Sequence, residues 1–130
     1  QTCNPEAPWL MRLGDVDARI TLNEEMTLRQ ALSFPPFGRW VRVVFSSPNR
    51  HKAEKAAEAM AIVIRTWDGI QIGGPMACAM EKIAHRFRVE IVIRDASRHI
   101  LPWKLAPLLS QLRVPSGVRR LVDVDPQDMM

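Results

Sequence analysis

Apolar and polar residues alternate most regularly between residues 86 and 94. Phenylalanine, valine and isoleucine occupy every second position there, and mainly charged residues lie between them. Because successive side chains of a strand point to opposite faces, this period predicts a β-strand with one face in the core. The core set is Phe87, Val89, Ile91 and Ile93, and the opposite set, expected in water, is Arg86, Arg88, Glu90, Val92 and Arg94.

Three other segments are predicted to be strands. Residues 40–45 are β-branched or aromatic around Arg42, and residues 118–124 end at Asp125-Pro126. Residues 70–72 form a short strand before Gly73-Gly74-Pro75, which predicts a tight turn followed by a short helical connection over 76–84. In the first segment Val41, Val43 and Phe45 share one face, and Trp40, Arg42 and Val44 share the other.

Helical spacing of apolar residues predicts two long helices between these strands. The first starts at Ser47-Pro48, an N-cap with a first-turn proline, and closes at Gly69. The second covers 97–113, where two internal prolines require a bend or a late start. An acidic helix over 15–32 precedes all of these, and a short helical turn over 5–12 closes at Gly14.

The predicted order is therefore a helix followed by β-α-β-β-α-β. Two β-α-β units sharing one sheet give an α+β, ferredoxin-like split arrangement, with both helices on one face and strands 40–45 and 86–94 in the centre. The acidic helix ends at Leu32, shortly before Pro35-Pro36, because neither proline can continue a helix. We expect an appended segment over 1–34 and one compact domain over 35–130.

Composition narrows the class of protein. The chain has 130 residues and is 47% hydrophobic, enough for one sizeable core. Cys3 and Cys78 have no CxxC spacing, so we expect free thiols rather than a disulfide or a zinc site. The longest apolar run, 59–64, is far shorter than the roughly 20 residues of a membrane span, and no signal peptide opens the chain. A cytoplasmic location without a membrane partner is expected.

Charge is uneven along the chain. The first 34 residues hold three arginines and five acids, whereas the rest hold 15 basic and nine acidic residues. Arginine supplies 14 of the 18 basic residues, and its planar guanidinium pairs bidentately with phosphate or carboxylate. This excess of basic residues indicates an anionic partner. The alternative is that the basic surface only keeps the protein in solution.

The predicted open face of the sheet suits DNA, because cations follow phosphates while an aromatic ring stacks on a base. The residues predicted to contact DNA are Trp40, Arg42, Lys82, Arg86, Arg88 and Arg94. In the alternative, Trp40 packs under the Pro35-Pro36 turn and the arginines pair with Glu90, Asp123 and Asp125.

No catalytic or metal-binding constellation is predicted. Gly73-Gly74-Pro75 lacks the residues that follow in a phosphate-binding loop, and the three histidines show no metal-ligand spacing. Asp123 and Asp125 share a strand face, as a catalytic carboxylate pair would, but pairing with arginines is favoured.

Five motifs in fixed order resemble the C-terminal region of the primosomal protein N-prime (PriA) family of bacterial replication-restart helicases. They are Glu25-x-x-x-Arg29, Phe34-Pro35-Pro36-Phe37, Gly74-Pro75, Arg86-Phe87-Arg88 and Asp123-Val124-Asp125-Pro126. The opening Gln1-Thr2-x-Asn4-Pro5 resembles the end of that family's second helicase lobe, so 1–34 would be the lobe end and a linker helix.

The resemblance implies a fragment of an ATP-dependent 3′–5′ DNA helicase that is not itself an enzyme. ATP and zinc would bind upstream parts of the parent protein, and no cofactor is expected here. The compact domain would be similar to ribosomal protein S10. Its implied partners are forked and single-stranded DNA, the acidic tail of single-stranded DNA-binding protein, and other primosome proteins.

Residue roles for the tail also follow from the resemblance. Arg98 matches a family arginine that faces the acidic tail, and four residues later the family pattern carries glutamine where this chain has Pro102. Lys82, His99 and Lys104 are further cations for an acidic tail, and Arg98 and Lys104 are the predicted tail-binding pair. Two alternatives stay open: a protein-interaction module with only incidental DNA contact, and a structural brace.

Overall fold

A computed structural model of the chain describes residues 3–12 and 18–126. It is a small α+β structure with one four-stranded antiparallel sheet. In chain order the elements are α1 (Pro8–Met11), α2 (Ala18–Ala31), β1 (Arg39–Ser47), α3 (Arg50–Ile64), β2 (Ile70–Ile83), β3 (Arg86–Asp95), α4 (Ile100–Gln111) and β4 (Arg119–Val124). Gln1, Thr2, Gly14 and the predicted helix start at 15–17 lie outside the described residues.

The strand order in the sheet is β2-β3-β1-β4, and all neighbouring strands are antiparallel. Val43 lies at the middle of the sheet, opposite Ile91 on β3 and Val122 on β4. The prediction that the first and third strands are central neighbours is confirmed.

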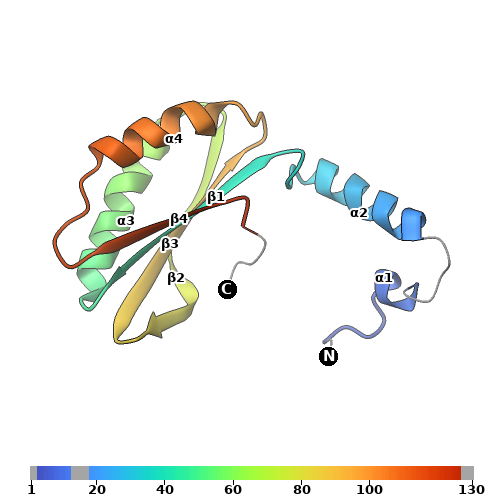
Figure 1. The fold of residues 1–130 in the computed structure, drawn as a ribbon, viewed down its shortest axis with the longest axis horizontal. Coiled ribbons are helices and arrows are strands. Elements are labelled where there is room, and N and C mark those ends of the chain that lie inside the picture. Colours follow the sequence, from blue (N-terminus) through green and yellow to red (C-terminus); the bar gives the residue numbers. More distant parts are fainter. Residues whose placement is uncertain (1–2, 13–17, 127–130) are drawn as a thin grey trace.

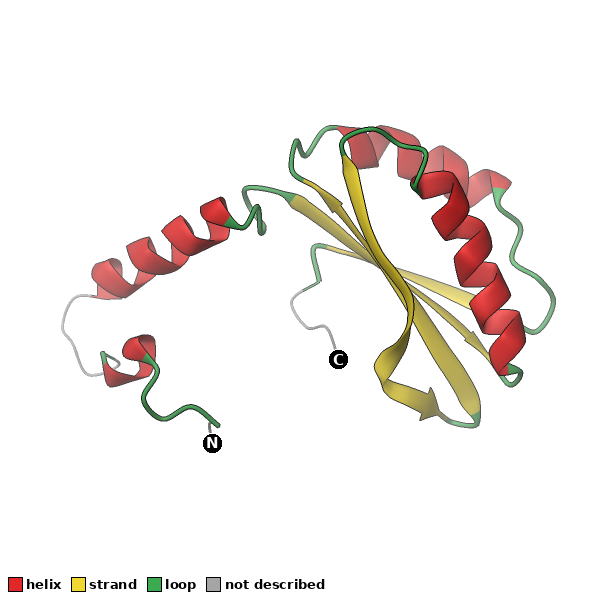
Figure 2. Cartoon of the chain, turned by 180° about the vertical axis from the view of Figure 1, so that it is seen from behind, coloured by secondary structure: helices red, strands yellow, loops and turns green. Residues whose placement is uncertain are grey.

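One face of the sheet and two helices enclose the core. Figures 1 and 2 show α3 and α4 crossing the same face of the sheet. Val89, Ile91 and Ile93 of the set predicted for β3 pack there with the predicted set of β1, and Met60 and Ile64 of α3 and Leu101 and Leu105 of α4 cover them. Burying such aliphatic side chains contributes roughly 1.5–3 kcal/mol each. The helix-facing sides of the central strands were therefore predicted correctly except at Phe87, which is half-buried and lies outside the core cluster.

The start of α3 differs from the prediction. Asn49, rather than Ser47, is the N-cap, and its side-chain oxygen accepts a hydrogen bond from the Lys52 backbone N–H. Ser47 remains in β1, and its hydroxyl accepts from the Asn49 backbone N–H. The cap shifted because β1 runs two residues beyond its predicted end at Phe45.

The predicted turn at 73–75 and helical connection over 76–84 are wrong. Strand β2 is continuous from Ile70 to Ile83, and its pairing with β3 shifts register between Gly73 and Met76 and again between Ala77 and Lys82. Gly74 has φ +93°, and a Cβ there would lie 2.6 Å from the Glu90 carbonyl oxygen. The glycine-rich segment is therefore a bulge where two backbones approach closely, and the strand resumes after it.

The sheet face away from the helices is not open at its centre, contrary to the prediction of a wet face. Arg42, Val44, Glu90 and Val92 are all buried, and Arg42 is only 5% exposed. Cys78, from the irregular part of β2, is buried beside Arg42 and Glu90. The second register shift in β2 thus covers side chains that a regular strand would have left in water.

Helices α1 and α2 extend away from the sheet (Figure 1). The segment 32–37, which we call the linker joint, connects α2 to β1, and three arginines donate to its carbonyl oxygens. Arg94 donates to Leu32 at 2.8 Å, Arg29 to Pro35 at 3.1 Å and Arg98 to Pro36 at 2.8 Å. The joint is therefore fixed by side chains from both sides.

Helix α4 starts at Ile100, which is the late start that the prolines were expected to require, with Pro102 in its first turn and Pro107 inside it. The start is fixed by Asp95, whose carboxylate accepts from the backbone N–H groups of Ile100 and Leu101 at 2.8 and 3.0 Å. No helix within the described ranges is both long and apolar enough to cross a membrane.

Candidate nucleic-acid interface

Basic residues from several elements meet at the end of the sheet where the β2–β3 hairpin turns. In the register of the sheet, Ser46 at the end of β1 lies opposite Arg88 on β3 and Arg119 on β4. Helix α3 begins just beyond this end of β1. We call this region the basic end, and its members are Arg50, Lys52, Lys55, Lys82, Arg86, Arg88, Arg113 and Arg119.

Contacts within the protein hold part of the basic end. Arg86 donates to the carbonyl oxygens of Ser46 at 2.7 Å and Gly117 at 2.9 Å, which ties the hairpin to the loop before β4. The Lys82 ammonium lies 4.7 Å from the centre of the Phe87 ring, and the Arg50 guanidinium lies 5.6 Å from it. Several cations are thus positioned by the scaffold before any ligand arrives.

Four other cations at the basic end form no ion pair within the described part of the chain. Lys52, Lys55, Arg113 and Arg119 are exposed, and none makes an ion pair with any residue in the described ranges. An exposed and unpaired cation is free to neutralise an external anion.

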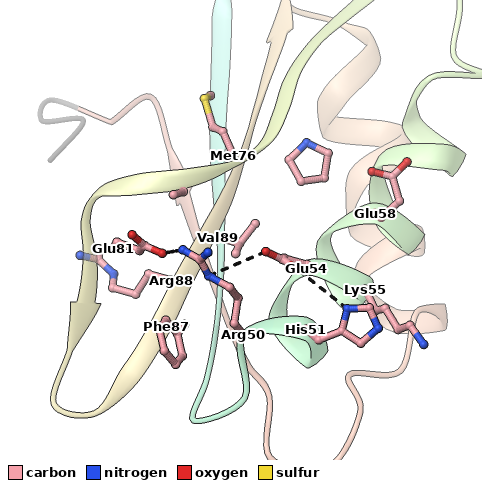
Figure 3. A pocket seen from close by; sticks show the side chains of 12 residues that line it. Arg50, His51, Glu54, Lys55, Glu58, Met76, Glu81, Phe87, Arg88 and Val89 are labelled. Carbon is pink, nitrogen blue, oxygen red and sulfur yellow. Dashed lines mark ion pairs between the residues drawn. The ribbon is translucent and has the colours of Figure 1, made fainter.

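A pocket of about 370 Å³ lies at this end, between the first turns of α3 and strands β2 and β3 (Figure 3). Arg50 lies between Glu81 from β2 and Glu54 from α3 and forms ion pairs with both. Glu58 is paired with Arg65 at 2.6 Å, and His51 Nδ1 lies 3.8 Å from Glu54. The acids that line the pocket are therefore already in contact with cationic or titratable side chains.

The residues predicted to contact DNA do not form one surface. Lys82, Arg86 and Arg88 lie at the basic end, whereas Trp40 and Arg94 lie at the other end of the central strands, beside the linker joint. The Trp40 indole N–H donates to the Ser33 carbonyl oxygen at 3.2 Å, and the Arg94 guanidinium lies 4.5 Å from its ring centre. Trp40 thus packs against the linker joint, as the alternative interpretation held.

Arg42 is locked in the interior. Its Nε donates to Glu90 at 2.6 Å, and both residues are buried. Burial alone would lower the pKa of Arg42, but the hydrogen bond and charge of Glu90 outweigh this and raise the pKa above its usual value. Burial, together with the adjacent Glu90 carboxylate, also raises the pKa of the Cys78 thiol. This cluster holds β2 against the sheet rather than facing a ligand.

The predicted tail-binding residues lie on another part of the molecule. Arg98 is exposed just before α4, and its guanidinium donates to Pro36 in the linker joint. The Lys104 ammonium lies 5.6 Å from the centre of the Trp67 ring. The predicted strand-face pair of carboxylates is not formed, because Asp123 lies on β4 whereas Asp125 follows the strand with φ +51°. Asp125 instead pairs with Arg39 at 2.9 Å, as expected of a structural acid.

Sequence reasoning missed five members of the basic end: Arg50, Lys52, Lys55, Arg113 and Arg119. They come from α3, the loop after α4 and the start of β4, so no window of the sequence contains them together. The predicted order of the strands could have brought some of them together, because in an antiparallel sheet the end of one strand lies beside the start of its neighbour.

Neither a metal centre nor a disulfide appears in the part of the chain that the structure describes. No group of three or more His, Cys, Asp or Glu residues is placed there to hold a metal ion. Cys3 is an exposed free thiol and Cys78 a buried one.

Known proteins resemble this chain over its whole length. The sequence model of the primosomal protein N C-terminal domain matches residues 30–127. The replication restart protein PriA of Treponema pallidum is 33% identical over 132 residues, covering 100% of this chain and 20% of that protein. The PriA proteins of Rickettsia felis and Haemophilus influenzae are 29% and 28% identical, covering 90% and 99% of the chain and 18% of each relative.

The chain thus spans about a fifth of the length of these replication restart proteins. The family match extends over the linker joint, the complete sheet and both packed helices. By this match, the chain belongs to the primosomal protein N family and carries its C-terminal domain.

Proposed function

We propose that this domain binds forked or single-stranded DNA during replication restart, as part of a DNA helicase, and that the basic end is the contact surface. The observation that carries the proposal is the convergence of eight Lys and Arg residues, four of them exposed and without an acidic partner among the described residues. A surface of this kind fits the phosphates of DNA, because each neutralised phosphate releases condensed counterions.

The proposed binding mode is largely independent of sequence. Cations on α3, on the hairpin and at the start of β4 come from separate elements, so they can follow a backbone rather than read base edges in a groove. Lys82, Arg86 and Arg88 keep their predicted role in this mode. For Trp40, Arg42 and Arg94 a direct DNA contact stays a prediction, and it requires them to leave the internal contacts described above.

The test is the salt dependence of binding to a forked oligonucleotide, measured by fluorescence anisotropy. Replacing Lys52 or Arg119 with alanine is expected to make the slope of log affinity against log salt shallower by about 0.9 for duplex contacts or about 0.7 for single strands. Lys104→Ala is the matched control, since it removes an exposed cation outside the basic end. Unchanged slopes for both basic-end variants would refute the proposed surface.

A second function, docking of an acidic protein tail, is favoured by one observation. Arg98 is exposed, and among residues 3–12 and 18–126 its guanidinium donates to one backbone carbonyl, so other N–H groups remain for a carboxylate. We propose Arg98 and Lys104 as its contacts. The resemblance places Pro102 where the family pattern carries glutamine, and in this proposal the tail therefore has one amide partner fewer.

The finer fold assignment is also our inference. The order β-α-β-β-α-β with a β2-β3-β1-β4 sheet supports the ferredoxin-like split arrangement similar to ribosomal protein S10. The division at residue 34 and the assignment of ATP and zinc sites to upstream parts of a parent helicase remain predictions.

A further inference from the structure

We propose that the pocket between α3 and the β2–β3 hairpin accepts one unpaired nucleotide of a bound DNA strand. The inference rests on the proposed function, because it assigns a ligand to a cavity within the basic end. Its volume of about 370 Å³ lies within the range of about 300–1,000 Å³ that small-molecule sites occupy.

The strand side of the pocket is apolar. Pro75, Met76 and Ala77 of β2 and Phe87 and Val89 of β3 line it. Met76 is 44% exposed and Phe87 is half-buried, so their side chains present apolar surface to the cavity. The flat face of a base matches such a floor, since stacking on aromatic and apolar side chains does not depend on base identity.

The helix side of the pocket is polar and carries both signs of charge. Arg50 and Lys55 rise from α3, and Lys55 has no ion-pair partner in the described part of the chain. The carboxylates of Glu54, Glu58 and Glu81 are paired, but each retains further acceptor positions. The exposed cations therefore fit a phosphate, and the carboxylates fit the amino group on a base edge.

This combination selects against simpler ligands. A free phosphate would satisfy the cations but leave the apolar floor in contact with water. An acidic peptide would approach three carboxylates. A base that is paired in a duplex hides the edge that the carboxylates could read, so only an unpaired nucleotide uses both sides of the pocket.

The test uses the full chain labelled at its methionine methyl groups and observed by NMR. We expect the Met76 methyl to shift saturably with deoxycytidine 5′-monophosphate, but not with deoxyribose 5-phosphate or inorganic phosphate. The Met60 methyl, fully buried in the core, is the internal control and should stay in place. Equal shifts with phosphate alone, or displacement of the nucleotide by an acidic peptide, would overturn the proposal.

A variant separates this proposal from the proposed function. Phe87→Leu keeps an apolar side chain but removes the ring, and it should weaken binding to a single strand about tenfold without changing the salt slope. If Lys52→Ala alters the slope while Phe87→Leu and the Met76 methyl show no effect, the pocket assignment fails and the DNA-binding surface stands. If the Met76 methyl shifts but neither Lys52→Ala nor Arg119→Ala changes the salt slope, the DNA-binding surface fails and the pocket assignment stands.

Discussion

Arg42 and Glu90 form a buried ion pair on the sheet face that lies away from the helices. Residues on adjacent central strands carry the two charges, and the irregular segment of β2 covers them. Moving two charges out of water is expensive, and a close hydrogen-bonded pair offsets that cost only while both partners are present. The pair therefore affects the free energy of unfolding most strongly when only one of its two partners is removed.

Removing one partner should destabilise the protein far more than removing both. Arg42→Met leaves Glu90 charged and buried, and we expect a loss of about 3–5 kcal/mol in the free energy of unfolding. The double change Arg42→Met with Glu90→Met is expected to cost much less, because no buried charge remains unpaired. Urea unfolding monitored by circular dichroism measures both. A double variant as unstable as the sum of the single variants would show that the two charges are not coupled.

At the scale of the element, the carboxylate of Asp95 organises the passage from β3 into α4. One oxygen accepts from the Ser97 hydroxyl and from the backbone N–H groups of Ser97 and Arg98, and the other caps the start of the helix. Burial alone would raise the pKa of Asp95, but these hydrogen bonds to its charged form hold the pKa below its ordinary value of 3.8.

This shift gives Asp95 a stabilising effect that depends on pH. Asp95→Asn places an NH₂ group against backbone donors, and at pH 7 it should cost about 2 kcal/mol of unfolding free energy. Since the folded-state pKa is lowered, the wild-type advantage is complete above about pH 4 and disappears as the pH falls through that lowered pKa.

Thermal or urea unfolding across this pH range measures the difference between the two proteins. Asp123→Asn, which changes an exposed carboxylate on β4, is the matched control and should show no such loss. A difference for Asp95→Asn that stays constant down to pH 2 would contradict the assignment.

Local sequence patterns predicted which helices and strands form better than they predicted where these elements end or which of their side chains other segments bury. The alternation at 86–94 gave β3 and its core side because that signal lies in a single strand. Gly73-Gly74-Pro75 was read as a turn because the same residues suit a turn and a bulge, and only the partner strand β3 distinguishes them. Arg42 looked exposed because nothing in its own strand indicates that a distant segment covers it.

The candidate site was less predictable than the fold. Lys82, Arg86 and Arg88 were found because they lie in one basic window. Arg113 and Arg119 were missed because their positions, beside Lys55 of α3 and opposite Ser46 at the end of β1, depend on how the chain returns after α4. Trp40 and Arg94 were expected on the open sheet face with the other predicted DNA contacts, but they lie together at the linker joint, where the Arg94 guanidinium is 4.5 Å from the Trp40 ring centre.

On the scale of the whole molecule, the two proposed binding surfaces lie at opposite ends of β3. Arg86 and Arg88 begin the strand at the basic end, and Asp95 ends it three residues before Arg98. A strand of ten residues is roughly 30 Å long, well beyond the Debye length of about 8 Å at physiological ionic strength. Charges at one end are therefore largely screened from those at the other.

The separation predicts that the two ligands bind independently. Saturating the domain with an acidic tail peptide should change the dissociation constant for forked DNA by less than about twofold at physiological salt. Arg98→Ala should weaken peptide binding and leave DNA binding unchanged. Anisotropy titrations with and without peptide measure both, and strong competition between the ligands would place them on one surface.

The three arginine hydrogen bonds to the linker joint couple the orientation of α2 to that of the sheet. Arginines from α2, from β3 and from the residues preceding α4 donate to carbonyl groups of the joint, so a rotation of α2 relative to the sheet would have to break these hydrogen bonds. A force that rotates α2 would therefore also act on the sheet, through the hydrogen bonds of the linker joint. Arg98 is exposed, so an anion that binds its guanidinium would compete with the Pro36 carbonyl and remove one of the three hydrogen bonds that hold the linker joint.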